Sequence, residues 1–330
     1  MQISPLGFPW KTEDPFLFCV HHLDFYPKGN SDLEPAYGTD GRNIGNDFQV
    51  KDGWRMYHGQ KIPGFPYHPH KGFETISIVE QGIIDHSDSL GGAGRFSAGD
   101  TQWMTAGKGI LHSEMFPMLN QTDGNTLELF QIWINLPAKD KLVEPHYKML
   151  WNEKTPVLNY DEDKVKIQLI AGKIEDQKAQ DPPPYSWASH TNNEVQVLIL
   201  TLQPGAKFNF RPTAPEIKRN LYFYSGKELT INDKNIPSYH NIKLEAAESY
   251  TLHSNDECKL LFLQGKPINE PVAQHGPFVM NTMEEIQEAF QEYRRTGFGG
   301  WPWPLQEQVH GKEKQRFALH SDGRLEELDF

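Results

Sequence analysis

The sequence predicts an all-β protein built from two tandem antiparallel barrels. Short runs of alternating polar and apolar residues, many of them β-branched, recur along the chain between turns that contain Gly or Pro. Residues 76–84 and 221–231 share the same order of strand, glycine and strand, which indicates that the barrel is duplicated. A chain of 330 residues is long enough for two domains that each bury a core.

Two pairs of metal-binding residue types lie in the part of the sequence assigned to the first barrel. His68 and His70 are separated by one residue, and His112 and Glu114 have the same spacing. Side chains two residues apart in a strand point to the same face, so each strand can direct two donor atoms at one point. Gly- and Pro-rich bends precede both pairs, as is typical of a site in a barrel mouth. The pattern indicates a cage of three histidines and one carboxylate around a divalent metal ion, and ordinary hydrogen-bonded strand histidines are the alternative.

The expected donor set limits both the metal and the chemistry. Nitrogen and oxygen donors of intermediate hardness suit iron(II), manganese, nickel, copper or zinc. Three neutral imidazoles and one carboxylate leave a divalent ion with a net positive charge, which favours anionic chelating substrates. Glu114 is the candidate catalytic base, because a weakly held carboxylate can accept a proton from such a substrate. A purely structural role as a ligand is the alternative for this residue.

Other polar residues near these pairs are weaker candidates. Glu74 is expected to hold a ligand imidazole or Lys71 in position rather than to bind the metal. Residues 102–104 lie between the two pairs and either line the cavity or pack as an ordinary strand. The other eleven histidines are assigned to ordinary surface or hydrogen-bonded roles. His58 is the least secure of these assignments, because it shortly precedes the first pair.

A domain boundary is expected after the strand at residues 129–135, which closes the first barrel. Polar and acidic stretches follow, interrupted by an alternating strand at residues 165–170, before a second strand-rich block begins at residue 195. We therefore expect a metal-binding barrel, a degenerate second barrel, and a terminal helix with a tail, at residues 1–150, 151–280 and 281–330.

The second barrel lacks the expected metal pair. Residues 211–219, which precede its strand, contain no histidine, and His253 and Glu257 have no partners at strand spacing. We expect this barrel to bind no metal and to support the first barrel or to bind a partner.

A helix is expected at the end of the second block. Thr282 and Glu285 form a capping-box pattern, and Gly297 marks the end of the helix. Apolar side chains recur between them at helical spacing, as expected for core packing: Ile286, Ala289, Phe290 and Tyr293. Residues 301–330 are expected to form an irregular tail that covers a barrel end, with a partner surface as the alternative.

Composition excludes several classes of function. The formal charge of −12 and the lack of any basic run argue against direct contact with nucleic acid. No apolar stretch has the length of a membrane span, and the N-terminus lacks the basic start and apolar core of a signal peptide. Cys19 and Cys258 are too few and too distant for a disulfide framework. We expect two buried free thiols and a cytoplasmic location.

Longer motifs resemble the pirin family of the cupin superfamily. They begin near residue 14, include the long matches at residues 68–75 and 99–115, and end in a closing segment at residues 275–282. The resemblance implies two tandem cupin barrels of the jelly-roll (double-stranded β-helix) type, and the metal ligands of the family fall on His68, His70, His112 and Glu114. Two departures are the absence of a proline often found before Gly99 and a longer extension after Gly297.

The resemblance also implies an activity. Several pirins act as quercetin 2,3-dioxygenases, which open a flavonol ring with dioxygen and release carbon monoxide. It therefore implies an iron(II)-dependent oxidoreductase, with a flavonol or a related chelating enediol as substrate. Other pirins are described as transcriptional cofactors that act through protein partners, so a metal-bearing regulatory protein without turnover is the alternative. A metal-free sugar-binding or structural barrel is a third possibility.

Overall fold

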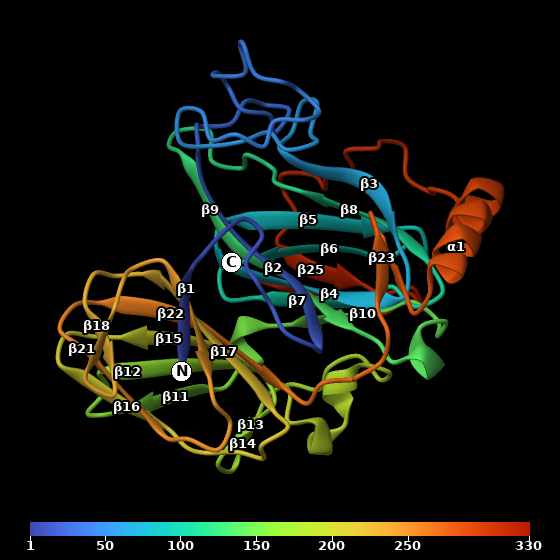
Figure 1. Ribbon diagram of the computed structural model, residues 1–330. Coiled ribbons are helices and arrows are strands. Elements are labelled where there is room, and N and C mark those ends of the chain that lie inside the picture. The colour runs from blue at the N-terminus through green and yellow to red at the C-terminus, as the bar shows by residue number, and fades with distance from the viewer. The chain divides into compact units, whose positions relative to one another are not determined.

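The computed structural model describes residues 1–330 and shows an all-β fold with one α-helix, α1 (Met283–Thr296), which confirms the predicted fold class (Figure 1). The chain forms two compact units that interleave in sequence. The first-barrel unit comprises His21–Gln131, Ala138–Asn152 and Glu270–Phe330. The second-barrel unit comprises Met1–Val20, Ile132–Pro137 and Glu153–Asn269. The contiguous boundaries expected from the sequence stay a prediction.

Two antiparallel sheets form most of the first-barrel unit. The larger has six strands, in pairing order β26 (Leu325–Leu328), β25 (Arg316–Leu319), β6 (Ala93–Ser97), β5 (Ile83–Asp88), β8 (Ile110–Met115) and β3 (Gly64–His70). The other has five strands, β10 (His146–Leu150), β7 (Thr101–Thr105), β4 (Phe73–Gln81), β9 (Asn125–Asn135) and β2 (Phe16–Tyr26), of which β2 and β9 extend across the division between the units. A separate pair is formed by β23 (Ala273–His275) and β24 (Phe278–Met280).

Side chains from these strands form an apolar core. Phe96 of β6, Met104 of β7 and Ile110 of β8 belong to one buried cluster and are at most 1% exposed. Strands β6, β7 and β8 are buried along their whole length, so both faces of each strand are covered. Polar side chains on these strands therefore lie inside the protein, where they can form a metal-binding or catalytic site.

The second-barrel unit has a sheet of seven strands and a sheet of four. The larger consists of β1 (Gln2–Pro5), β20 (His240–Leu244), β17 (Lys218–Ser225), β22 (Cys258–Gly265), β15 (Gln196–Leu202), β12 (Val165–Ala171) and β11 (Val157–Tyr160). The smaller consists of β16 (Ala206–Phe210), β21 (Tyr250–Ser254), β18 (Leu229–Ile231) and β19 (Lys234–Ile236), and a hairpin joins β13 (Lys173–Ile174) to β14 (Gln177–Lys178).

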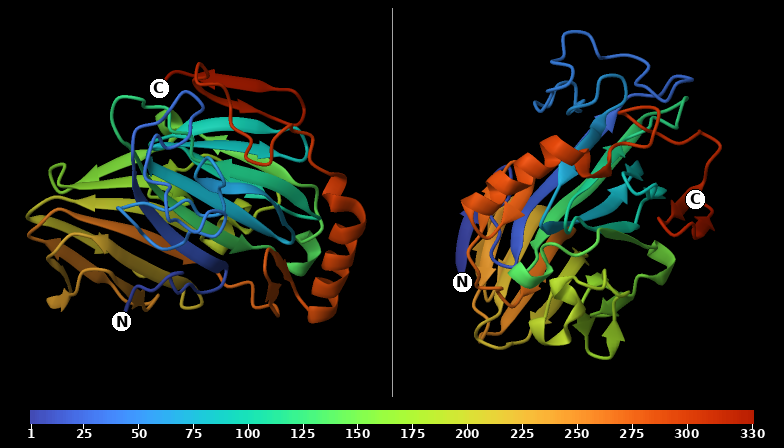
Figure 2. Two further views of the ribbon diagram at one scale, coloured as in Figure 1. Left: turned by 90° about the horizontal axis from the view of Figure 1, so that it is seen from above. Right: turned by 90° about the vertical axis from the view of Figure 1, so that its right-hand side faces the viewer.

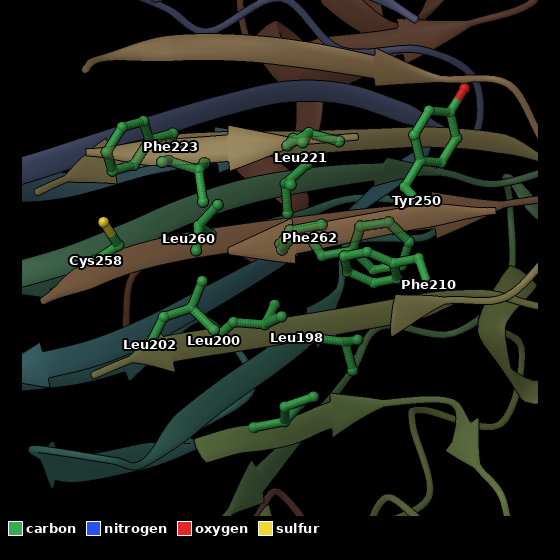
Figure 3. Packing of buried hydrophobic residues seen from close by; sticks show 14 of the residues in the cluster. Leu198, Leu200, Leu202, Phe210, Leu221, Phe223, Tyr250, Cys258, Leu260 and Phe262 are labelled. Carbon is green, nitrogen blue, oxygen red and sulfur yellow. The ribbon is translucent and has the colours of Figure 1, made fainter. Parts of the chain in front are cut away.

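Alternate residues of the larger sheet build the core of this second unit (Figure 3). Leu198 and Leu200 of β15 stand opposite Phe262 and Leu260 of β22, and all four side chains are at most 1% exposed. Burying each such side chain stabilises the fold by about 1.5–3 kcal/mol, so the alternation predicted from the sequence fixes which face of each strand turns inward.

The predicted helix is confirmed at both ends and on its apolar face. Thr282 Oγ1 accepts a hydrogen bond from Glu285 N (3.2 Å), and the Glu285 carboxylate accepts one from Thr282 N (2.9 Å). Gly297 ends the helix in the left-handed conformation. Ile286 and Ala289 are buried against residues of β23 and β24, so the apolar stripe is core packing.

The chain after α1 is more ordered than the sequence analysis predicted. Residues 301–315 carry no helix or strand, whereas β25 and β26 form a hairpin that adds to the larger sheet of the first-barrel unit through β6 (Figure 2). Arg95 of β6 anchors this segment, because its guanidinium donates hydrogen bonds to the carbonyls of His310, Gly311 and Lys314 at 2.8–3.0 Å.

Five short 3-10 helices complete the structure: Ala138–Asp140, Asn152–Lys154, Trp187–Ser189, Thr191–Asn193 and Gly297–Gly299. Cys19 and Cys258 are free and buried, as expected. None of the helices combines the length and the apolar character that crossing a membrane requires.

Candidate metal centre

Three of the four predicted ligands meet between two neighbouring strands. His68 and His70 lie on β3, and His112 lies on β8 directly opposite His68. The donor nitrogens of the three side chains lie within 4.8 Å of one another. The two strands also approach closely at Gly64, where a Cβ atom would lie 2.5 Å from the carbonyl oxygen of Glu114. The i, i+2 spacing and the antiparallel pairing together produce the cluster.

Hydrogen bonds at the outer ring nitrogens set the orientation of two of these imidazoles. His68 Nδ1 lies 2.9 Å from the Pro66 carbonyl oxygen, and His70 Nδ1 lies 3.4 Å from that of Pro277. A carbonyl oxygen only accepts, so each Nδ1 carries the proton and each Nε2 presents a lone pair. The two Nε2 atoms lie 3.1 Å apart. Two lone pairs facing each other at this distance repel, and a cation between them removes the repulsion.

Burial keeps the three imidazoles in the form that binds metal. It lowers the pKa of His68 to about 4 and holds the pKa values of His70 and His112 well below the usual value. Both ring nitrogens of His112 are buried and have no hydrogen-bond partner. An unsatisfied buried polar group costs about 1–3 kcal/mol, and coordination to a metal ion would satisfy one of these nitrogens. The three residues therefore fit a divalent metal.

Glu114, the fourth predicted ligand, is held beside the cluster by other side chains. It lies on β8 two residues after His112, and its carboxylate oxygens accept hydrogen bonds from Ser77 Oγ (2.5 Å) and Gln131 Nε2 (2.6 Å). Burial raises the pKa of Glu114. The structure brings together the three histidines without this carboxylate, so metal coordination by Glu114 stays a prediction.

His86 is a residue of the site that the sequence analysis missed. It lies on β5 directly opposite Glu114, and Asp88 of the same strand lies opposite His112. His86 is fully buried, its Nε2 is 3.2 Å from Asp88 Oδ2, and its ring centroid is 5.7 Å from that of His112. The signal was present, since His86 and Asp88 repeat the one-residue gap of the ligand pairs.

The weaker candidates lie outside the three-histidine cluster. The Glu74 carboxylate accepts hydrogen bonds from Thr105 Oγ1 (2.6 Å) and Trp103 Nε1 (3.3 Å), and Lys71 Nζ pairs with Glu292 at 3.0 Å. Residues 102–104 are buried strand residues. His58 is exposed, and its Nδ1 lies 2.9 Å from the Gly45 carbonyl oxygen.

Comparison with known proteins gives the family of the chain. A family model described as Pirin matches residues 35–134, and one described as Pirin C-terminal cupin domain matches residues 197–299. The chain belongs to the pirin family. Its fold is therefore that of a bicupin, as the resemblance in the sequence implied.

Individual pirins and related structures resemble most of the chain. A protein of Pseudomonas aeruginosa provisionally named quercetin 2,3-dioxygenase is 38% identical over 237 residues, which cover 71% of this chain and 79% of that protein. A pirin-like protein of Solanum lycopersicum is 36% identical over 241 residues, covering 71% and 77% of the two chains. The crystal structure of quercetin 2,3-dioxygenase from Acinetobacter baumannii has a TM-score of 0.71 at 26% identity and covers 91% of this chain and 98% of that chain.

Proposed function

We propose that this pirin is a metal-dependent dioxygenase that opens the ring of a flavonol or a related chelating enediol with dioxygen. The observation that carries the proposal is the cluster of His68, His70 and His112, whose donor nitrogens lie within 4.8 Å of one another and whose imidazoles are kept neutral by lowered pKa values. The names of the Pseudomonas and Acinetobacter relatives support the reaction class. The two free, buried cysteines support a cytoplasmic location.

The ligands in this proposal are His68, His70 and His112, with Glu114 as the fourth. Iron(II) is the metal proposed, and other divalent transition metals suit the same donors. When bound, the ion supplies a Lewis-acidic centre for a chelating substrate and for dioxygen. The carbonyls of Pro66 and Pro277 hold two of the imidazoles in the tautomer that leaves Nε2 free to coordinate.

Glu114 is proposed as the base that takes the proton of a substrate hydroxyl. Burial raises its pKa, so its carboxylate is more basic than an exposed one and better matched to a proton transfer near neutral pH. Ser77 and Gln131 each donate a hydrogen bond to it, which holds both carboxylate oxygens in fixed positions. The proton would move to one of these oxygens, and the hydrogen bond at that oxygen would weaken or rearrange.

The test combines metal content with oxygen uptake. Quercetin added to the iron(II)-loaded protein is expected to be consumed with uptake of oxygen. Because His112→Ala removes a direct ligand, metal affinity is expected to fall by more than about 100-fold, and oxygen uptake should be lost. His58→Ala is the matched control, since His58 is exposed and outside the cluster.

Two outcomes would contradict the dioxygenase proposal. A protein that holds metal, consumes no oxygen with flavonols or related enediols, and captures a specific protein partner would favour the regulatory alternative. A purified protein that binds no divalent metal would exclude both and leave a metal-free barrel.

A further inference from the structure

A pocket of about 560 Å³ opens in the second-barrel unit, and no candidate metal ligand lines it. Its volume lies within the range of small-molecule sites, roughly 300–1,000 Å³. It lies where the barrel core changes from apolar to polar. Leu198, Phe262 and Leu221 form one apolar row across the neighbouring strands β15, β22 and β17. Two residues further along each strand, the next row on the same face consists of Gln196, Gln264 and Arg219.

Arg219 is a buried cation that forms no ion pair, and the Glu194 carboxylate acts on it only through a longer-range electrostatic interaction. Its side chain lies on the same face of β17 as Leu221 and Phe223 of the core, and the residue is only 2% exposed. Its Nε is buried with no hydrogen-bond partner, and its single hydrogen bond, from Nη1 to the Ala246 carbonyl, is long at 3.5 Å. A buried charge is costly unless it is paired and hydrogen-bonded, so this guanidinium is prepared for an external anion.

Aromatic rings lie beside this guanidinium. Phe210 and Phe262 stack with centroids 4.6 Å apart (Figure 3). The Arg219 Cζ atom lies 5.6 Å and 5.7 Å from the two centroids. Phe208 packs edge-on against Phe210 at 5.1 Å and lines the same pocket. The pocket therefore offers an aromatic wall next to a buried positive charge.

Arg219 is the one cation of this pocket that is buried. Lys173, Lys207 and Arg211 also line the pocket but are exposed, and Arg211 lies 3.8 Å from the Glu175 carboxylate. Glu194 also lines the pocket, and its carboxylate accepts a hydrogen bond from the Thr213 hydroxyl. A ligand with one carboxylate would therefore meet a single buried cation beside an existing carboxylate. A planar carboxylate matches the fork of one guanidinium.

We propose that this pocket of the second barrel binds a small aromatic carboxylate, with its carboxylate on Arg219 and its ring against Phe208 and Phe210. This inference does not depend on the reaction proposed for the first barrel. It assigns a ligand to the barrel that lacks the histidine pairs.

Calorimetric titration of the full-length protein with cinnamate and its neutral amide tests the proposal. Cinnamate should bind and cinnamamide should not, because only the acid places a charge against the guanidinium. Arg219→Gln should weaken cinnamate binding by about 10- to 100-fold, the effect expected from losing hydrogen bonds to a charged group. Arg211→Gln is the matched control on the rim and should change the affinity by less than about fivefold.

Two further variants test whether cinnamate binding depends on the metal centre and whether the apolar wall contributes to it. His112→Ala should bind cinnamate as the wild type does, because the pocket lies in the other unit. Phe208→Ala keeps the charge and shortens the wall, so it should weaken cinnamate binding by about tenfold and leave acetate binding unchanged. Thermal melting of each variant without ligand checks that it is folded.

Several results would overturn the proposal. They are undiminished cinnamate binding in folded Arg219→Gln, loss of binding in His112→Ala, inorganic phosphate binding as tight as that of cinnamate, or no binding of either carboxylate at millimolar concentration.

Discussion

In the first barrel, three histidines converge between β3 and β8, whereas the second barrel places Arg219 and two glutamines in one row across three strands. Both sets of side chains continue the inward-facing rows of an otherwise apolar core. The first set presents neutral lone pairs and therefore suits a cation, while the second presents a fixed positive charge and suits an anion. The comparison teaches that two barrels of one fold can carry buried polar groups of opposite character, neutral lone pairs in one and a positive charge in the other.

Among the tests of this contrast between the two barrels, the largest expected effect is the loss of turnover when Glu114 is replaced. Glu114→Gln keeps the shape of the side chain but removes the base, so turnover of a flavonol should fall by about 10²- to 10⁴-fold. Oxygen uptake by the iron(II)-loaded variant is the measurement, with metal content determined on the same sample. The matched control is Glu257→Gln, an exposed carboxylate of the second barrel, which should leave turnover unchanged. Undiminished turnover in Glu114→Gln would remove this residue as the base.

The second test compares two buried arginines. Arg95 in the first barrel forms two hydrogen bonds of 2.7 Å to the Asp85 carboxylate and three more to carbonyls, whereas Arg219 forms no ion pair and has one long hydrogen bond to a carbonyl. Arg95→Met leaves a buried carboxylate uncompensated and should lower the free energy of unfolding by about 3–5 kcal/mol.

Arg219→Met, in contrast, removes a buried charge without stranding a partner. It should leave the free energy of unfolding nearly unchanged or raise it, as measured by urea denaturation of both variants. A loss of stability in Arg219→Met as large as that in Arg95→Met would show that Arg219 is already paired, and the contrast between the barrels would fail.

The most gradual effect should appear on acidification of the metal-free protein. Burial lowers the pKa of His68 to about 4 and that of His22 to about 3, against 6.5 for an ordinary histidine. The unfolded chain therefore takes up protons below pH 6.5 that the folded chain does not. Stability that is fully present above this pH is lost as the pH falls toward these lower values. The slope is at most about 1.4 kcal/mol per pH unit for each such histidine.

The location of the acid effect distinguishes the two barrels. All buried histidines lie in the first-barrel unit, so amide hydrogen exchange in mildly acidic solution should increase in β3 and β8 before it increases in β17 and β22. Bound metal should suppress the effect in β3 and β8, because coordination competes with protonation. Equal loss of protection in both barrels would contradict this assignment.

Local patterns in the sequence were sufficient to predict the parts of the site that lie on single strands. The one-residue gap between His68 and His70 places both on one face of β3, and the structure shows them together. The capping box at Thr282 and the apolar stripe that follows it also needed no distant residue, and α1 begins and ends where they predicted.

Features that depend on pairing between distant strands were not predictable in this way. His86 reaches Glu114 only because β5 pairs with β8 in one particular register. The β25–β26 hairpin follows an irregular segment and joins the larger sheet only by pairing with β6, which is distant in the sequence. Arg219 lies in the stretch before a strand that was noted only for its lack of histidine, and the register of β17 against β22 reveals it as a buried cation.

The sequence by itself determined the all-β class, the duplication, and which side chains along each strand share a face, because the two-residue period of a strand is a local property of the chain. The tertiary structure alone decided which rows of side chains meet, and so which buried groups are left without a partner. The reason is that a shift of one residue in strand pairing turns every side chain to the opposite face, and the packing of the whole barrel selects the register.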